Sequence, residues 1–115
     1  MRFSREVKWA SEAVGLDFLN ALQLKGKKSA VLLKEVGDRS LLFCGLFPEV
    51  AKKRHVSIHY FEDVGRGAYW QVGNLETPQT AVLFYALCQE FDSLRKVLNA
   101  TRHLASEDVI FSRQH

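Results

Sequence analysis

The chain has few of the residues that hold very small proteins together through covalent links or metal ions. Its 115 residues include two cysteines, two prolines and one methionine. Cys44 and Cys88 are far apart and each follows apolar residues, which favours buried free thiols over a disulfide or a zinc site. A chain of this length can bury a sufficient core without such links. We therefore expect one domain over residues 1–115.

Long apolar runs and recognisable catalytic motifs are also missing. No stretch approaches the roughly 20 continuous apolar residues of a membrane-spanning helix. The charged N-terminus lacks the apolar segment of a signal peptide. Neither a Gly-x-Gly-x-x-Gly phosphate loop nor a Gly-x-Ser-x-Gly nucleophile turn occurs. We expect a cytoplasmic protein without membrane contact, and no residue stands out as catalytic.

The formal net charge is +3, and the basic residues form two clusters. The first contains Lys25, Lys27 and Lys28, and the second covers residues 52–55. Such clusters can contact phosphates, so weak nucleic-acid binding through them is an alternative function. We favour solvated helix ends, because cations complement the C-terminal dipole of a preceding helix. A helix-turn-helix is disfavoured, since its recognition helix, Arg39–Leu46, is too apolar to face DNA.

Apolar residues recur at helical spacing near both ends of the chain. This spacing predicts a helix from about Ser4 to Leu24, with Gly15 as a candidate kink and Gly26 in the stop that follows. Thr77-Pro78 is a typical helix start, and the pattern then continues to about Leu104 as one long helix. Residues 106–115 could form a flexible tail, an extra turn or a docking strand.

The middle of the chain allows two interpretations. Short helices over Ala30–Val36, which Ser29 would cap, and Arg39–Phe47 would meet at Gly37, whereas an α+β alternative places a hairpin over residues 29–46. Leucine and alanine outnumber β-branched residues here, which favours helices. A further helical stripe runs from about Val56 to Leu75. We predict an all-α fold, a compact bundle of five or six helices.

Chemically versatile side chains are concentrated between Arg54 and Tyr69. On a helix, His55 and His59 would share one face, with Glu62 or Asp63 one turn further along. Two imidazoles and a carboxylate can converge on a divalent cation, so this spacing suggests a metal-binding protein or enzyme. A bare His-x-x-x-His is common, however, and the alternative is a solvated polar face.

The same segment also suggests anion or small-ligand binding. Side chains that can donate hydrogen bonds surround the two glycines at 65 and 67; they are Arg54, His59, Tyr60, Arg66 and Tyr69. Each glycine costs a helix roughly 1 kcal/mol relative to alanine, which requires compensation. We expect another helix or a ligand to approach closely at a small-residue face made by Gly65 and Ala68.

One pattern resembles a group of uncharacterised bacterial proteins. It contains a Gly-Leu-Phe-Pro-Glu turn at residues 45–49, a basic run, Val-Ser-x-x-Tyr-Phe at 56–61, Gly-x-x-Ala-Tyr at 65–69 and a later helix at 91–99. The resemblance covers roughly residues 35 to 100. It implies a helical bacterial domain and carries no known activity.

Together, these observations favour a non-catalytic interaction or small-ligand-binding module, with no cofactor indicated. Aromatic residues on the last predicted helix could form a homodimer interface, including Phe84, Tyr85 and Phe91. Size-exclusion chromatography with light scattering distinguishes this dimer from a monomer that holds a tightly bound metal or metabolite.

The preference for a solvated polar face over a metal site can be tested directly. We expect negligible binding of zinc, manganese and iron by both the wild type and His59→Ala in equilibrium dialysis. Binding by the wild type that is lost in the variant would instead establish the metal site.

Overall fold

Every regular element in the described part of the chain is an α-helix. The computed structural model describes the backbone of residues 2–48 and 57–114 and the side chains of residues 13–48 and 57–104. The helices are α1 (Arg2–Gln23), α2 (Gly26–Leu46), α4 (Ile58–Leu75), α5 (Pro78–Gln89) and α6 (Phe91–Gln114). The all-α prediction is confirmed. The hairpin alternative for residues 29–46 is wrong, because they all lie in α2.

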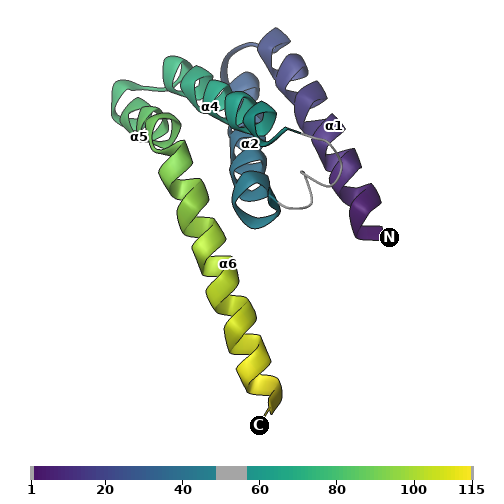
Figure 1. The fold of residues 1–115 in the computed structure, drawn as a ribbon. Helices are drawn as coiled ribbons and strands as arrows, with labels where there is room; N and C mark the ends of the chain where they lie inside the picture. The colour runs from purple at the N-terminus through teal and green to yellow at the C-terminus, as the bar shows by residue number, and fades with distance from the viewer. Residues whose placement is uncertain (1, 49–56, 115) are drawn as a thin grey trace.

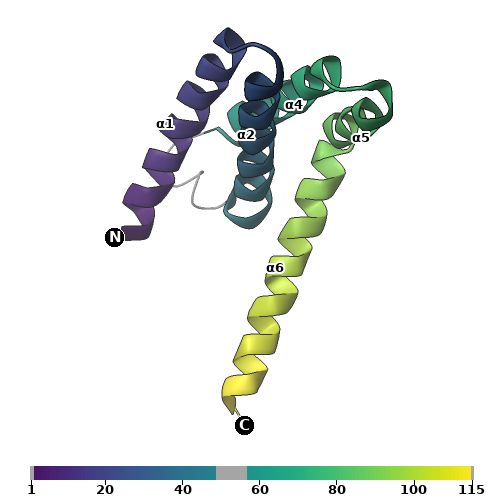
Figure 2. The same ribbon diagram turned by 180° about the vertical axis from the view of Figure 1, so that it is seen from behind.

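Helix α2 is the centre of the arrangement and packs against α1, α4 and α6. Helices α1 and α2 run side by side in opposite directions, and α4 crosses α2, with which it makes the most extensive contact (Figure 1). Helix α5 turns back along α4. Seen from behind, α2 lies between α1 and α6 (Figure 2). The C-terminal part of α6 extends beyond the other helices.

Gly37 lies inside a continuous helix, so the prediction of two short helices that meet there is wrong. The glycine serves close packing instead of ending a helix. A Cβ on Gly37 would lie 2.6 Å from Cε1 of Tyr69 on α4. Ser29 is also inside α2 and caps nothing. Its hydroxyl donates to the carbonyl of Ala21, 2.7 Å away, and so joins α2 to the last turn of α1. Helix α1 likewise runs unbroken through Gly15.

The long helix expected from Pro78 to Leu104 is two helices. The chain breaks at Glu90, yet both backbone groups of Glu90 keep helical hydrogen bonds. Its N–H donates to the Ala86 carbonyl, and its carbonyl accepts from the Leu94 N–H. The apolar spacing therefore continues across the break, which is why the sequence pattern does not reveal it. The change of direction lets α5 pack on α4 while α6 packs on α2. Helix α6 also continues past Leu104 to Gln114.

Helix starts and turns follow local sequence signals more closely. Thr77 precedes α5 and Pro78 occupies its first position, as predicted. Ser57 precedes α4, and its Oγ accepts a hydrogen bond from the His59 N–H at 3.1 Å. Gly26 has φ +63°, a value that suits glycine, in the turn between α1 and α2.

The predicted close approach at Gly65 and Ala68 is confirmed. A Cβ on Gly65 would lie 2.5 Å from Cε2 of Phe91 and 2.9 Å from Cβ of Ser40. Phe91 and Ala68 are fully buried. Ser40 is buried as well, and its hydroxyl finds no hydrogen-bond partner among the described residues, so its small size explains its place better than its polarity. The small residues bring α2, α4 and the start of α6 together.

Two glycines of α4 provide a matched test of this packing. Gly65→Ala forces a methyl group against a buried ring and should lower the free energy of unfolding by about 1–3 kcal/mol. Gly67→Ala places its methyl 3.5 Å from Phe18, an ordinary contact, and should raise it by up to about 1 kcal/mol through helix propensity. Urea unfolding measures both values. Equal effects of the two substitutions would contradict this view of the crossing.

Candidate functional site

The structure places only part of the proposed metal site. Arg54 and His55 lie outside the described residues. His59 is exposed in the first turn of α4, while Glu62 is largely buried and accepts a hydrogen bond from Arg66 at 3.2 Å. Among the residues that the structure describes, no group of three or more histidine, cysteine or acidic side chains is arranged to hold a metal ion. The His55 and His59 site therefore stays a prediction.

Three of the predicted ligand-binding residues point to three different neighbours of α4. Tyr60 lies against α1, where its hydroxyl meets the space beside Gly15. Arg66 reaches the end of α5 and donates from Nε to the Cys88 carbonyl at 3.1 Å. Tyr69 is buried against α2. The structure does not bring these side chains together around one ligand.

Tyr69 joins α4 to α2 through a hydrogen bond at the edge of the core. Its hydroxyl donates to Oδ1 of Asp38 at 2.7 Å, and the other carboxylate oxygen accepts from Lys34 at 2.9 Å. Burial raises the pKa of the Tyr69 hydroxyl far above its ordinary value, and the bond to Asp38 adds to this effect. The phenol therefore stays protonated and acts as a structural donor.

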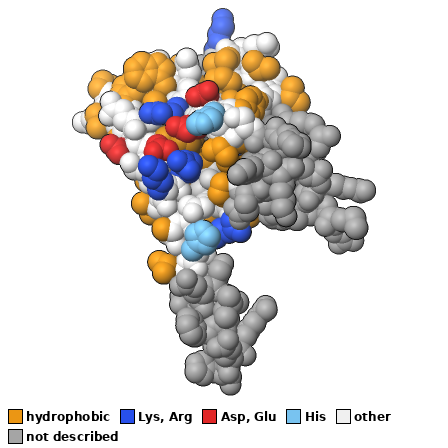
Figure 3. Space-filling model, in the orientation of Figure 1, with side chains coloured by type: hydrophobic (Ala, Val, Ile, Leu, Met, Phe, Trp, Pro, Cys, Tyr) orange, Lys and Arg blue, Asp and Glu red, His pale blue; other side chains and the backbone are white. Residues whose placement is uncertain are grey.

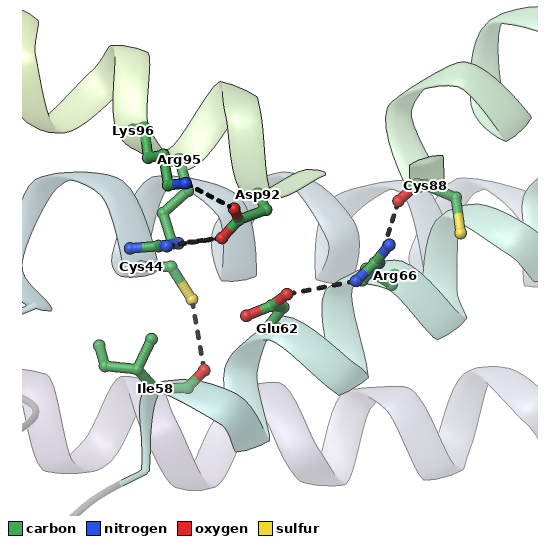
Figure 4. Close-up of polar contacts among 8 residues, drawn as sticks. All are labelled: Cys44, Ile58, Glu62, Arg66, Cys88, Asp92, Arg95 and Lys96. Carbon is green, nitrogen blue, oxygen red and sulfur yellow. Dashed lines mark hydrogen bonds and ion pairs between the residues drawn. The ribbon is translucent and has the colours of Figure 1, made fainter. Parts of the chain in front are cut away.

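Charged side chains gather where α4 meets the beginning of α6 (Figure 3). Figure 4 shows how these groups pair: Arg66 lies between Glu62 and the last turn of α5, and Asp92 accepts from Arg95 at 2.5 Å and from Lys96 at 3.1 Å. The bond to Asp92 raises the pKa of the Arg95 guanidinium above its ordinary value. Arg66 thereby joins α4 to the end of α5, while the contacts of Asp92 lie within the first turns of α6.

The C-terminal end of α2 is capped by side chains from α6. Asn99 donates to the Gly45 carbonyl at 3.2 Å, and Arg102 donates to the Leu46 carbonyl at 2.7 Å. The last carbonyls of a helix have no partner within it, so these bonds satisfy them. Sequence reasoning could not find these pairs, because their members lie more than 50 residues apart along the chain.

Cys44 is a buried free thiol, as predicted. Burial raises the pKa of its thiol to about 12, so the thiolate is scarcely populated at neutral pH. Its sulfur lies 3.8 Å from the Ile58 carbonyl, at the start of α4. Cys88 is half-buried and also free. Cys44 is therefore poorly suited to act as a nucleophile.

An apolar hollow of about 690 Å³ lies between α1 and α4. Leu16 and Leu19 form one side and are 62% and 58% exposed. Tyr60 and Val64 form the other; the lining also includes Gly15 and Phe18. We call this set of six residues the α1–α4 groove. Leu16 was missed from the sequence because it lies outside the apolar stripe that predicts α1, and its exposure is what marks it.

The aromatic residues expected at a dimer interface are mostly used within the chain. Phe84 and Phe91 are buried, and Tyr85 is half-buried against Trp70, with ring centres 4.9 Å apart. The Tyr85 hydroxyl donates to Asn74 at 2.6 Å. The predicted face at Phe84 and Phe91 is therefore wrong, because these rings fill the core between helices.

Comparisons with known proteins give no relative from which a role could be transferred. No protein-family model, curated protein or solved structure matches the chain. Within the described residues, no helix is both long and apolar enough to cross a membrane.

The ion pairs of Asp92 predict a specific response to acid. Hydrogen bonds from Arg95 and Lys96 lower the pKa of the Asp92 carboxyl below its ordinary 3.8. A lowered folded-state pKa stabilises the fold above the unfolded-state value, and this contribution disappears as the pH falls through the folded-state value. Asp92→Asn should therefore lose less stability than the wild type between about pH 5 and 2 in acid titrations followed by circular dichroism.

Asp63→Asn is the matched control for this titration. Asp63 is exposed on α4 and forms no ion pair with any described residue, so its substitution should leave the acid dependence as in the wild type. An Asp92→Asn curve that follows the wild type would show that the ion pairs do not stabilise the fold.

Proposed function

We propose that this protein is a non-catalytic interaction module that binds an amphipathic helix of a partner in the α1–α4 groove. The observation that carries this proposal is the exposed apolar lining of the groove. Most of the surface of Leu16 and Leu19 is accessible although both belong to a well-formed helix beside a deep core. Soluble monomers rarely keep a contiguous apolar surface of this kind without a partner.

The shape of the groove suits a helix better than a compact metabolite. Its walls are the i, i+3 pair Leu16 and Leu19 on α1 and the i, i+4 pair Tyr60 and Val64 on α4. Two such rows create a channel for the apolar side chains of a third helix, which is a common mode of peptide recognition. Of the predicted ligand-binding residues that the structure describes, Tyr60 lines this site, and its hydroxyl can bond to a partner at the rim.

The proposal also includes the origin, the location and the oligomeric state expected from the sequence. The resemblance at residues 35–100 supports a bacterial origin, and the expected cytoplasmic location is kept as part of the proposal. We retain the homodimer as part of the proposal. Since Phe84 and Phe91 are buried within the protomer, its contacts have to come from other residues.

A library of displayed helical peptides provides a direct test. Peptides selected on the wild-type protein should bind at least about tenfold more weakly to Leu19→Ser, because the substitution removes apolar surface from the groove. Leu83→Ser is the matched control, since Leu83 is 57% exposed but lies on α5. Its affinity should remain that of the wild type when measured by fluorescence anisotropy.

Two outcomes would contradict the proposal. Selected peptides that bind Leu19→Ser as tightly as the wild type would place the binding surface elsewhere. A selection that enriches no helical peptide at all would remove the helix as the occupant of the groove.

A further inference from the structure

A second apolar hollow, with a different rim, lies on the outer face of the first half of α2. Its volume is about 540 Å³, and Val31 and Leu32 form its apolar part. Lys27 and Lys28 stand beside them, with Glu35 one turn further along. Val31 is 60% exposed. We call this set of five residues the lysine-rimmed hollow; none of them belongs to the α1–α4 groove.

The two lysines of the hollow have no acidic partner among the described residues. Lys27 and Lys28 lie in the first turn of α2, which carries no acidic residue, and the helix dipole disfavours cations at that end. Neither lysine forms an ion pair within the described part of the chain. Their position just after the end of α1 complements the dipole of that helix, but it pairs neither lysine with a described carboxylate. An acidic group from another molecule would supply such a pair.

The C-terminal end of α6 has the complementary composition. Its sequence places Glu107 and Asp108 directly before Val109, Ile110 and Phe111. The backbone here continues as a helix that projects beyond the bundle. An isolated helical end of this length is marginal in water without a partner. Acidic residues followed by apolar ones match a hollow in which lysines stand beside Val31 and Leu32.

We propose that the lysine-rimmed hollow of one protomer binds the C-terminal end of α6, residues 105–114, of a second copy. The same molecule cannot supply this end, because α2 begins beside the turn from α1 while α6 leads away from that turn to the opposite end of the molecule (Figure 1). Two copies placed in opposite directions can each insert α6 into the other. In this arrangement each hollow holds the α6 end of the other copy, and a two-fold axis relates the two copies.

The hollow is shallow and open, and the occupant is inferred from the match between its lysines and apolar residues and the composition of residues 105–114. This inference supplies contacts for the dimer in the proposed function. It is independent of the α1–α4 groove, because the two surfaces share no residue and are changed by different variants.

A charge exchange tests the proposal with the full chain. The wild type should dimerise in sedimentation equilibrium, and Lys27→Glu with Lys28→Glu should weaken the dimer at least about tenfold through repulsion of Glu107 and Asp108. Adding Glu107→Lys and Asp108→Lys to that protein should restore dimerisation, since opposite charges then face each other again. The dimer of the wild type should also weaken at high salt.

An apolar substitution provides the second measurement. Val31→Ser should weaken the dimer, whereas Val82→Ser should not, because Val82 is 69% exposed on α5 and lies outside the hollow. Circular dichroism confirms that each variant is folded. The proposal is overturned if the wild type stays monomeric. It is also overturned if neither the charge exchange nor Val31→Ser changes the affinity of the dimer. Flotation of the wild type with phosphatidylglycerol vesicles, lost in the Lys27 and Lys28 variant, would assign the hollow to a membrane instead and likewise overturn it.

Discussion

The close crossing of α2 and α4 is the constraint on which the rest of the structure depends. Gly37 accepts the ring of Tyr69, and Gly65 accepts Ser40 and the ring of Phe91. These contacts leave no room for a methyl group, so glycine is required although it weakens each helix. Because the crossing also takes in Phe91, it sets where α6 begins and thereby where α6 can reach the carbonyls at the end of α2.

This packing decides which residues remain for binding. Two polar side chains of the cluster between Arg54 and Tyr69 are committed to groups within the fold: Tyr69 bonds to Asp38, and Arg66 bonds to Glu62 and to the Cys88 carbonyl. Among the described residues, the α1–α4 groove and the lysine-rimmed hollow both keep apolar surface exposed. This exposed apolar surface is the basis of the proposed binding of helices.

The helical character of the chain could be predicted because it depends on local patterns. Thr77-Pro78 marks the start of α5, although the Thr77 side chain makes no capping hydrogen bond, and the glycines at 65 and 67 signal an anomaly in an otherwise helical stripe. Gly37 was misread as a stop because its partner, Tyr69, lies 32 positions away. The candidate site was misread for a similar reason: residues that are close in sequence, such as Tyr60, Arg66 and Tyr69, lie on different faces of one helix.

Sequence patterns predicted a mostly helical chain, the approximate position of α1 and α4, the start of α5 and the need for close packing at Gly65. These features follow from spacing, capping and the cost of glycine, all of which act within a few residues. The arrangement of the helices was needed to show that α2 is continuous, that the chain turns at Glu90, and that Leu16 and Val31 face outward while Phe84 and Phe91 are buried. Exposure depends on what other helices cover, and contacts between distant parts of the chain are not encoded in the periodicity of either part.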